Sequence, residues 1–351
     1  MIEVKKDGIL LEKTDLVFEN ESVLNPGTIR EGDYVHLFYR AVSNGNYSSI
    51  GYCRLNGPFT VEERFNKPVL FPEFEYESHG VEDPRIVKIE DTYYLTYTAY
   101  DGVNALGALA VSKDLLHFEK LGLLVPQITY EEFSGLATAK KEINDKYLRY
   151  NDNKGAVENQ GKKILVWDKN VIFFPRKIND KFYFLQRIKP DIQIVVSVTD
   201  LKELTNEFWR NYFLHLGDFI FMSPKYPHEI NYIGGGCPPV ETKAGWLLIY
   251  HGVHDTVAGF VYSACAALLD LENPRTEIAR LPYPLFKPEA VWEKRGEVNN
   301  VCFPTGTALF GDTLYIYYGA ADSLIAYASV SLSALVKELM LYTEKDEKHI
   351  N

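Results

Sequence analysis

Five segments of the chain share one pattern of turn residues and hydrophobic residues. Each opens with a polar turn and continues as a run of aromatic and aliphatic residues, the pattern of a half-buried strand after a hairpin turn. Each is followed by a strand of small residues and preceded by a strand that carries a proline. The five segments are 32–41, 91–99, 180–188, 244–252 and 312–320, and the prolines are Pro26, Pro84, Pro175, Pro239 and Pro304.

A fivefold repeat of antiparallel strands predicts an all-β fold, namely a five-bladed β-propeller that takes in residues 1–351 as a single domain. A β-sandwich has no reason to repeat one unit five times. Two stretches depart from the pattern, and we expect little helix elsewhere. An insertion at about 131–163 is charged and partly helical, and is either a solvated insertion or a lid or interface arm. The tail at about 331–348 has leucines at helical spacing and is predicted to pack outside the propeller.

Composition excludes several classes of partner. The formal net charge is −11 and no long basic run occurs, so nucleic acid and membranes are not expected partners. No apolar stretch approaches the ~20 residues that span a bilayer, and the first residues lack a signal-peptide core. We expect a cytoplasmic protein, or a periplasmic one if a leader has been removed. The four cysteines show neither metal spacing nor a disulfide framework, so no metal or cofactor is expected. A homo-oligomer is compatible with the sequence.

Equivalent positions of the repeats carry different polar residues. At one position of the hairpin strands stand Arg40, Thr98, Arg187, His251 and Gly319. Just beyond this position lie acids that include Asp101 and Asp322. Because the inner strands of a propeller converge on a central channel, these side chains predict a concave site for a ligand with many hydroxyl groups. The alternative is a set of solvated loop ends.

Five motifs then carry a specific resemblance. They are "GVEDPRIV", "YYLTYTAYDG", "FFPRKINDKFYFLQRI", "GGGCPPVETKAGWLLIYHGV" and "LYIYYGAAD". From about residue 20 to residue 330 the chain resembles family 130 of the glycoside hydrolases. That family consists of mannoside phosphorylases and some β-mannosidases built on five-bladed propellers. The resemblance implies an enzyme that acts on a β-mannoside disaccharide or oligosaccharide.

The resemblance makes Asp83 the general acid, with its proton relayed through a hydroxyl of the mannose. Such an acid must hold its proton at neutral pH. Glu82 and an enclosed channel would raise the pKa of Asp83, and an inward-pointing Arg85 would lower it. Substrate contacts are predicted at Asn25, Arg40, Arg85, Asp101 and Asp322. We expect Asp83 and Asp101, at the two ends of one hairpin, to line the same sugar channel.

A phosphorylase uses inorganic phosphate as co-substrate, and phosphate needs cationic and hydrogen-bonding donors. By resemblance these are Lys169, Asn170, Arg187, His251 and Tyr262. Lys169 stands where many relatives have arginine. Tyr232 stands where phosphorylase relatives often have lysine, so one phosphate ligand is missing from the pattern.

That departure keeps a hydrolase as the alternative. An inverting β-mannosidase needs a carboxylate base about 6.5–9.5 Å from the acid, and Glu229 and Glu241 are the candidates. The retained Arg187 and His251 favour phosphate. A third hypothesis is a propeller that binds glycans without catalysis. Such a protein would not need the acid Asp83 opposite an anion pocket. The sequence leaves the sugar linkage and the acceptor open.

Overall fold

The computed structural model describes residues 2–149 and 163–343. Within these ranges the fold is mostly β, as predicted, and the strands form four sheets that are antiparallel apart from one residue pair. The largest sheet has two halves, joined by the parallel pair of Ser48 and Gly80. Its strands are β2 (Ser22–Glu31), β3 (Tyr34–Ser43), β4 (Tyr47–Asn56) and β5 (Thr60–Arg64), then β6 (Gly80–Ile89), β7 (Thr92–Tyr100), β8 (Ala105–Ser112) and β9 (Phe118–Leu123).

The other three sheets follow in chain order. The first is β10 (Lys169–Phe173), β11 (Phe182–Arg187), β12 (Ile192–Val198) and β13 (Ile220–Met222). The second is β14 (Tyr232–Gly235), β15 (Val240–Thr242), β16 (Gly245–Thr256), β17 (Gly259–Leu269) and β18 (Glu277–Arg280). The third is β19 (Cys302–Phe310), β20 (Thr313–Ala320) and β21 (Leu324–Ser331), with β1 (Lys5–Leu11) paired to β21. That the first strand of the chain completes the last sheet was not foreseen from the sequence.

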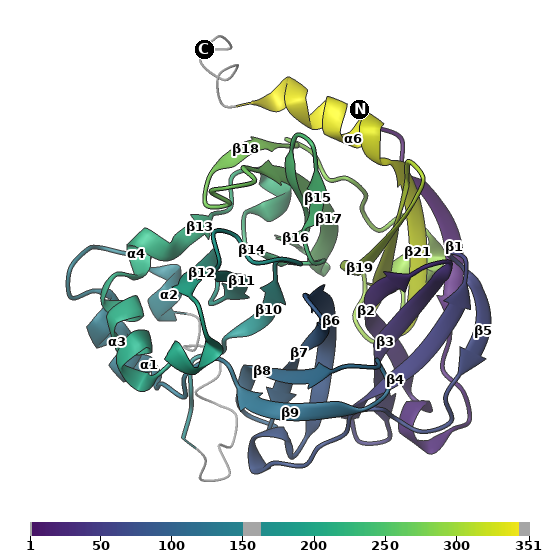
Figure 1. Cartoon of the computed structure of the whole chain (residues 1–351), viewed down its shortest axis with the longest axis horizontal. Coiled ribbons are helices and arrows are strands. Elements are labelled where there is room, and N and C mark those ends of the chain that lie inside the picture. Colours follow the sequence, from purple (N-terminus) through teal and green to yellow (C-terminus); the bar gives the residue numbers. More distant parts are fainter. Residues whose placement is uncertain (1, 150–162, 344–351) are drawn as a thin grey trace.

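The two halves of the largest sheet and the other three sheets make five strand groups. The first strand of each group lies toward the middle of the molecule. Figure 1 shows β2, β6, β10, β14 and β19 around one central region, with the outer strands at the periphery. Contacts link β19 with β2, β2 with β6, β6 with β10 and β10 with β14. The five repeated segments form the second strand of each hairpin, namely β3, β7, β11, β16 and β20. Side chains at the inner ends of these strands are therefore brought together.

The prolines do not mark the repeat as predicted. Pro26, Pro84 and Pro304 lie within β2, β6 and β19. Pro175, however, follows β10, and Pro239 lies between β14 and β15. The proline is therefore not a repeated strand residue, and the feature shared by the first three hairpins is a bulge, described below.

Helices occur in both predicted places and in others. The insertion contains α1 (Tyr130–Ala137) and α2 (Lys146–Arg149), and the tail contains α6 (Leu332–Leu339), which buries Leu335 and Leu339. Residues 150–162 of the insertion and the tail from 344 lie outside the described residues. The expectation of little helix elsewhere is wrong. The additional helices are α3 (Asn206–Leu214), α4 (Leu216–Phe219) and α5 (Val291–Lys294).

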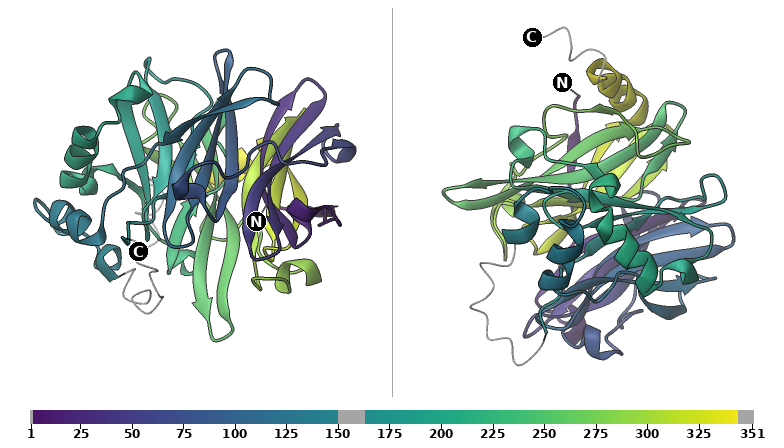
Figure 2. Two further views of the ribbon diagram at one scale, coloured as in Figure 1. Left: turned by 90° about the horizontal axis from the view of Figure 1, so that it is seen from below. Right: turned by 90° about the vertical axis from the view of Figure 1, so that its left-hand side faces the viewer.

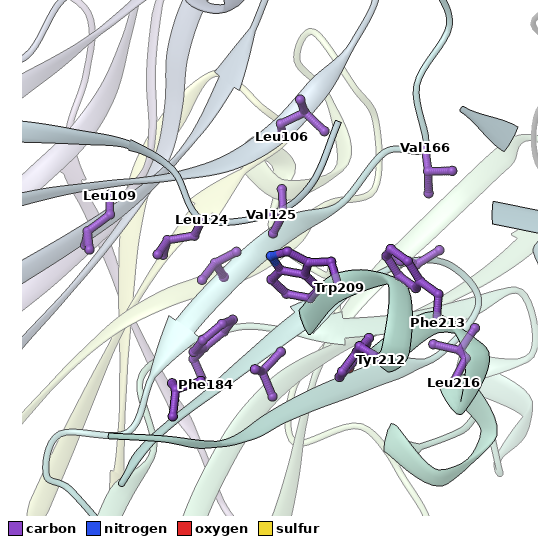
Figure 3. Packing of buried hydrophobic residues seen from close by; sticks show 14 of the residues in the cluster. Leu106, Leu109, Leu124, Val125, Val166, Phe184, Trp209, Tyr212, Phe213 and Leu216 are labelled. Carbon is purple, nitrogen blue, oxygen red and sulfur yellow. The ribbon is translucent and has the colours of Figure 1, made fainter. Parts of the chain in front are cut away.

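Helix α3 forms because its sequence is capped and amphipathic. The Thr205 side chain accepts a hydrogen bond from the Phe208 amide, which satisfies one free donor of the first turn. Trp209, Tyr212 and Phe213 share one face and are buried in a hydrophobic cluster with strands β8 to β12 (Figure 3). Phe133 of α1 meets Phe213 at 5.4 Å between ring centroids, so the described part of the insertion packs against α3. None of the helices in the described ranges combines the length and the apolar character that crossing a membrane would require.

A buried cluster of glutamate, tyrosine and a cation repeats in four of the five strand groups of the described residues. In each cluster a tyrosine hydroxyl donates to a fully buried glutamate, which also pairs with a lysine or arginine. The clusters are Glu19–Tyr39–Arg64, Glu77–Tyr97–Lys120, Glu229–Tyr250–Arg280 and Glu293–Tyr318–Lys6. The cation always comes from the outer strand, which is β5, β9, β18 or β1. The clusters stabilise the packing inside each group, because a buried charge must be paired.

Candidate active site

A bulge aims three polar side chains at the centre of the molecule. Strand register shifts by one residue at Asn25, Asp83 and Asn170, each at the same place in its hairpin. All three residues adopt positive φ, between 50° and 54°. Asparagine and aspartate tolerate this left-handed backbone better than other residues that carry a side chain. The bulge therefore explains why these residue types stand at the inner ends of β2, β6 and β10.

The bulges open onto a cavity of about 360 Å³. This volume lies near the lower end of the ~300–1,000 Å³ found for small-molecule sites. Eight of the predicted site residues line it: Asn25, Arg40, Asp83, Lys169, Asn170, Arg187, Tyr262 and Asp322. Phe260, from the β16–β17 hairpin that projects beyond the other strands in Figure 2, also lines the cavity.

Asp83 is surrounded by cations and by one amide. Asn25 Nδ2 donates a hydrogen bond of 2.7 Å to Asp83 Oδ1. Burial by itself would raise the pKa of Asp83, but Lys169, Arg40 and Arg85, together with the Asn25 hydrogen bond, lower it below its usual value. The carboxyl is therefore ionised at neutral pH. The sequence argument holds for enclosure, which raises this pKa, and for Arg85, which lowers it, but the net shift is downward.

Glu82 instead organises the cations. Its carboxylate lies 2.9 Å from Arg40 Nη2 and 3.8 Å from Lys169 Nζ, and it is buried. Asp322 lies in the same charge cluster. Burial raises the pKa of Asp322 to about 6; Arg40 opposes the rise, and Asp83 adds to it. The cavity thus contains two carboxyl groups in opposite electrostatic situations, since the pKa of Asp83 is lowered and that of Asp322 is raised.

Part of the cavity wall is cationic. Lys169, Arg187 and Lys189 all line it. The Lys189 Nζ atom lies over the Tyr232 ring, 3.7 Å from its centre, and the Tyr232 hydroxyl is 2.6 Å from that of Tyr262. Three cations beside two hydroxyl groups form a site suited to an anion.

His251 lies just behind this wall. It is fully buried, and burial together with Arg187, Arg85 and Lys189 lowers its pKa well below the usual value, so the ring is neutral. Gly234 makes room for it, because a Cβ there would lie 2.5 Å from the His251 ring and 2.9 Å from the Arg187 side chain. The glycine-rich strand therefore allows His251 and Arg187 to pack side by side. His251 is not among the cavity-lining residues, so its contact with phosphate stays a prediction.

Two predicted substrate residues lie elsewhere. Arg85 is buried, and its guanidinium donates to the backbone carbonyls of Asp83 and Gly236, at 2.6 and 2.7 Å. It therefore braces the bulge from behind. Asp101 lines a different pocket, with Glu75 and Asn104 among others, and its carboxylate accepts hydrogen bonds from the amides of Val103 and Asn104. The two ends of the Gly80–Gly102 hairpin do not line one cavity.

Neither candidate base faces Asp83. Glu229 is fully buried in one of the repeated clusters, where it accepts hydrogen bonds from two backbone amides and from the Tyr250 hydroxyl and pairs with Arg280. Glu241 lies on β15, is half exposed, and forms a bidentate salt bridge with Arg176. Neither lines the cavity, and both predictions of a base at these positions are corrected.

Sequence reasoning missed Trp167 and Lys189, which line the cavity. A period-two signal was present, since Trp167 stands two residues before Lys169 and Lys189 two residues after Arg187. Residues at this spacing share one face of an extended chain. Lys189 also supplies a cation next to Tyr232, the position at which the sequence comparison found lysine missing.

The fold and the cavity define a mostly β protein whose site suits a hydroxyl-rich ligand together with an anion. Residues 8–341 match glycoside hydrolase family 130, described as β-1,4-mannooligosaccharide phosphorylase. The chain belongs to this family, and the resemblance seen in the sequence is confirmed.

Curated relatives and a solved structure agree with this assignment. The chain is 33% identical over 346 residues to a 1,2-β-oligomannan phosphorylase of Thermoanaerobacter sp. (strain X514), covering 95% of this chain and 98% of the relative. It is 35% identical over 328 residues to a β-1,2-mannobiose phosphorylase of the same strain, covering 89% and 91%. The β-1,2-mannobiose phosphorylase of Listeria innocua, solved in complex with β-1,2-mannobiose, superposes with a TM-score of 0.67 at 25% identity over 92% of each chain.

Proposed function

We propose that this protein is an inverting phosphorylase of β-mannosides, that it takes β-1,2-linked substrates, and that its strand groups are the blades of a single five-bladed propeller. The single observation that carries the reaction type is the cationic wall of Lys169, Arg187 and Lys189 in the same cavity as Asp83. The linkage rests on the two Thermoanaerobacter relatives, whose names specify β-1,2 bonds. The propeller rests on the five hairpins whose first strands surround one centre (Figure 1).

In the proposed reaction, Asp83 donates its proton toward the oxygen of the scissile bond. The bond between C1 of the mannosyl unit and that oxygen breaks, and a bond between C1 and a phosphate oxygen forms. If the nucleophile is HPO₄²⁻, the product is the singly protonated ester. Its remaining proton can return to Asp83, which restores the acid for the next turnover. No charge or atom is left over in this cycle, and no base is needed.

Phosphate and the acid are coupled electrostatically in this scheme. Lys169, Arg40 and Arg85 lower the pKa of Asp83. A phosphate dianion on the wall of Lys169 and Arg187 would compensate part of that positive charge, which raises the pKa of a neighbouring carboxyl. We therefore expect Asp83 to acquire its proton when phosphate binds. Binding of the nucleophile would thus put Asp83 into the protonated form that acts as the general acid.

Sugar hydroxyl groups find partners on the other side. Asn25, Arg40 and Asp322 line the cavity next to Asp83 and offer one amide, one cation and one carboxyl. This combination suits the mannosyl unit that is transferred. A hydrolase would need a carboxylate base opposite the acid. Among the described residues that line the cavity, the carboxyl groups are those of Asp83 and Asp322, and both belong to the sugar side.

The test is to incubate the enzyme with β-1,2- and β-1,4-linked mannobiose, with and without inorganic phosphate, and to measure mannose 1-phosphate and free mannose. We expect α-mannose 1-phosphate from the β-1,2 substrate, formed only with phosphate, with its anomeric configuration read by proton NMR. Free mannose released at the same rate without phosphate would overturn phosphorolysis. Preference for the β-1,4 substrate would overturn the linkage alone.

A further inference from the structure

One of the four buried clusters differs from the others in its composition. The cluster of Glu229, Tyr250 and Arg280 has a histidine, His228, directly before its glutamate. The residues before the other three glutamates are aromatic, namely Phe18, Tyr76 and Trp292. Cys265 pairs with the tyrosine of this cluster in the strand register. The tyrosines of the other clusters pair with small residues, namely Gly51, Ala108 and Ala326. This cluster alone among the four therefore adds an imidazole and a thiol to the repeated carboxylate.

The imidazole, the carboxylate and the thiol lie together. Possible ligand atoms of His228, Glu229 and Cys265 are all within 4.8 Å of one another, and the three residues are buried. His228 belongs to the 3-10 helix η4 (Pro227–Glu229), where its ring stacks on that of Tyr226 at 5.9 Å between centroids, whereas Cys265 lies on β17. Ligands from two distant segments leave no metal-binding spacing in the sequence, which is why the cysteine pattern predicts no metal.

The His228 ring carries a buried nitrogen that needs a partner. Only 8% of the residue is exposed, and its Nε2 atom has no hydrogen-bond partner among the described residues. This atom lies 3.8 Å from Oε1 of Glu229, which is beyond hydrogen-bonding distance. Buried polar groups are normally satisfied, and a bound ion is one explanation for an exception. A metal ion between the ring and the carboxylate would satisfy this nitrogen.

The two carboxylate oxygens of Glu229 have different surroundings. Oε2 accepts hydrogen bonds from two backbone amides and pairs with Arg280, whose charge is shared with Glu277. Oε1 accepts a hydrogen bond from the Tyr250 hydroxyl and is the oxygen nearer His228. Because a carboxylate oxygen has two lone pairs, Oε1 can keep the tyrosine and also bind a cation. The structural role of Oε2 is therefore compatible with a metal ligand at Oε1.

A glycine makes room for these groups. Side chains at positions 250, 252 and 254 of β16 share one face, because they alternate along an extended strand. A Cβ at Gly252 would lie 2.9 Å from Glu229 Cγ and 3.1 Å from Cys265 Sγ. The other three clusters have alanine at the equivalent position, two residues after the tyrosine, namely Ala41, Ala99 and Ala320. The glycine therefore allows the carboxylate and the thiol to approach β16 closely.

His254 is a candidate for a fourth ligand. It stands two residues after Gly252 on the same face of β16, and it interacts electrostatically with His228. Its Nδ1 atom is buried and has no hydrogen-bond partner in the described part of the chain.

We propose that His228, Glu229 and Cys265 bind a zinc ion, with His254 or a water molecule as the fourth ligand. Zn²⁺ prefers four tetrahedral ligands drawn from imidazole nitrogen, thiolate sulfur and carboxylate oxygen. Its bonds of ~2.0–2.3 Å place ligand atoms about 3.5 Å apart, so small side-chain rotations close the site. On binding, the Cys265 thiol releases its proton to solvent, and the charges of the thiolate and of Glu229 then balance the dication.

The role of this site is structural. None of its ligands lines the cavity, and His251 projects from the opposite face of β16. A zinc ion would join η4 to the β16–β17 hairpin. Because the ion binds the folded chain, it raises the free energy of unfolding.

The experiment uses the purified full chain and measures Zn²⁺ binding by calorimetry, the absorption spectrum with Co²⁺, and thermal unfolding with and without Zn²⁺. We expect one Zn²⁺ per chain, a thiolate-to-cobalt charge-transfer absorption, and a higher midpoint of unfolding with Zn²⁺. Mg²⁺, which prefers six oxygen ligands, should not replace Zn²⁺.

The repeated clusters provide the variants. His228→Phe and Cys265→Ala introduce the residue types that Phe18 and Ala108 show at the equivalent positions, so both proteins should fold. Each should lower the affinity for Zn²⁺ by more than about tenfold, because removing even a residue that only orients a ligand costs ~10–100-fold. Cys53→Ala, which removes a buried cysteine beside the Glu19 cluster, is the matched control and should bind Zn²⁺ as the wild type does.

Three results would overturn the proposal. They are a wild type that binds no Zn²⁺, binding that is unchanged in both variants, and a Co²⁺ complex without thiolate absorption. Unchanged binding in both variants would place the ion elsewhere on the protein. If one variant does not fold, the other variant and the wild-type cobalt spectrum still decide. None of these measurements depends on turnover, so the result is independent of the proposed function.

Discussion

The ammonium group of Lys189 lies 3.7 Å from the centre of the Tyr232 ring. A cation over an aromatic face is attracted by the ring quadrupole, which fixes its position. Lys189 therefore brings a positive charge to Tyr232, the position at which phosphorylase relatives often have lysine. The cation that is absent from β14 at Tyr232 is supplied by Lys189, just after the end of β11.

This relationship predicts the effect of Lys189→Met. If the charge binds phosphate, its loss removes one charge-assisted partner, worth ~1.5–3 kcal/mol or roughly 10- to 150-fold in affinity. The KM for phosphate should rise by that factor, with the KM for the mannoside nearly unchanged. The double variant Lys189→Met with Tyr232→Lys should recover part of the loss. Equal rises in both KM values would show that Lys189 only supports the packing of the site.

Arg187→Ala should act on phosphate in the same selective way. Its guanidinium lines the cavity between Lys169 and Tyr232, and it is the arginine of the cationic wall. Initial rates over a range of phosphate concentrations will show the change, and Arg176→Ala on the outer surface is the matched control. Unchanged phosphate dependence in Arg187→Ala would remove the cationic wall from the mechanism.

Asp83→Asn should abolish turnover while leaving sugar binding nearly intact. General acid catalysis is typically worth ~10²–10⁴-fold. The change keeps the shape of the side chain and its left-handed backbone, which asparagine tolerates, as Asn25 and Asn170 do in the equivalent bulges. Turnover and mannobiose binding are measured on the same preparation. Activity within a few fold of wild type would make Asp83 a structural residue of the bulge.

Glu229→Gln should lower stability without affecting phosphate use. The carboxylate pairs with Arg280, and removing one partner of a buried pair costs ~3–5 kcal/mol. The midpoint of thermal unfolding should therefore fall, and the KM for phosphate should stay within about twofold. Glu77→Gln, the same change in another repeated cluster, should give a similar drop. Loss of turnover in a stable Glu229→Gln protein would restore Glu229 as a catalytic base.

Asp168 should make stability depend on pH. It is buried, both of its carboxyl oxygens are without a hydrogen-bond partner among the described residues, and burial raises its pKa to about 8, against an opposing effect of Arg187. A raised folded-state pKa contributes stability below the unfolded value of ~3.9, and this contribution is lost as the pH rises through about 8. Asp168→Asn should thus gain stability relative to wild type at pH 8.5 compared with pH 5, as measured by thermal unfolding. A constant difference between the two pH values would contradict the assignment.

The repeat and the family motifs were sufficient to predict the β architecture and to name eight residues that line one cavity, because one pattern recurs five times along the chain. The prediction of a catalytic base failed because the local sequence does not show whether a glutamate points into the packing of its own strand group or into the cavity. Glu229 precedes a glycine-rich strand in the chain, yet its carboxylate points into the packing of its own strand group and not toward the cavity. The direction of such a side chain follows from the local turn, and the hydrophobic periodicity of the sequence does not reveal it.

Asp101 and α3 illustrate two other limits. Asp101 ends its strand as expected, but it caps the next turn through the Val103 and Asn104 amides, a local interaction available to any aspartate that precedes a glycine turn. The helix α3 had a readable signal, with apolar residues at 209, 212, 213 and 216 and a threonine cap. It was overlooked because every repeat was expected to consist of strands alone. Trp167 and Lys189 were missed for a different reason, since they stand outside the repeated position, on the same face two residues from Lys169 and Arg187.

The pairing of β1 with β21 has a consequence for how the chain could be rearranged. Lys6 on β1 supplies the cation for Glu293 from the other end of the chain, whereas the other clusters take it from an outer strand nearby in the sequence. Deleting residues 2–11 would leave the β21 edge unpaired and Glu293 without its ammonium partner. An open edge of this kind can pair with the edge of a second molecule, so the shortened chain is expected to self-associate more than the full-length chain. A circular permutant that links the two ends and opens between β5 and β6 would keep these strand pairs, and should fold as a monomeric unit with its cavity unchanged.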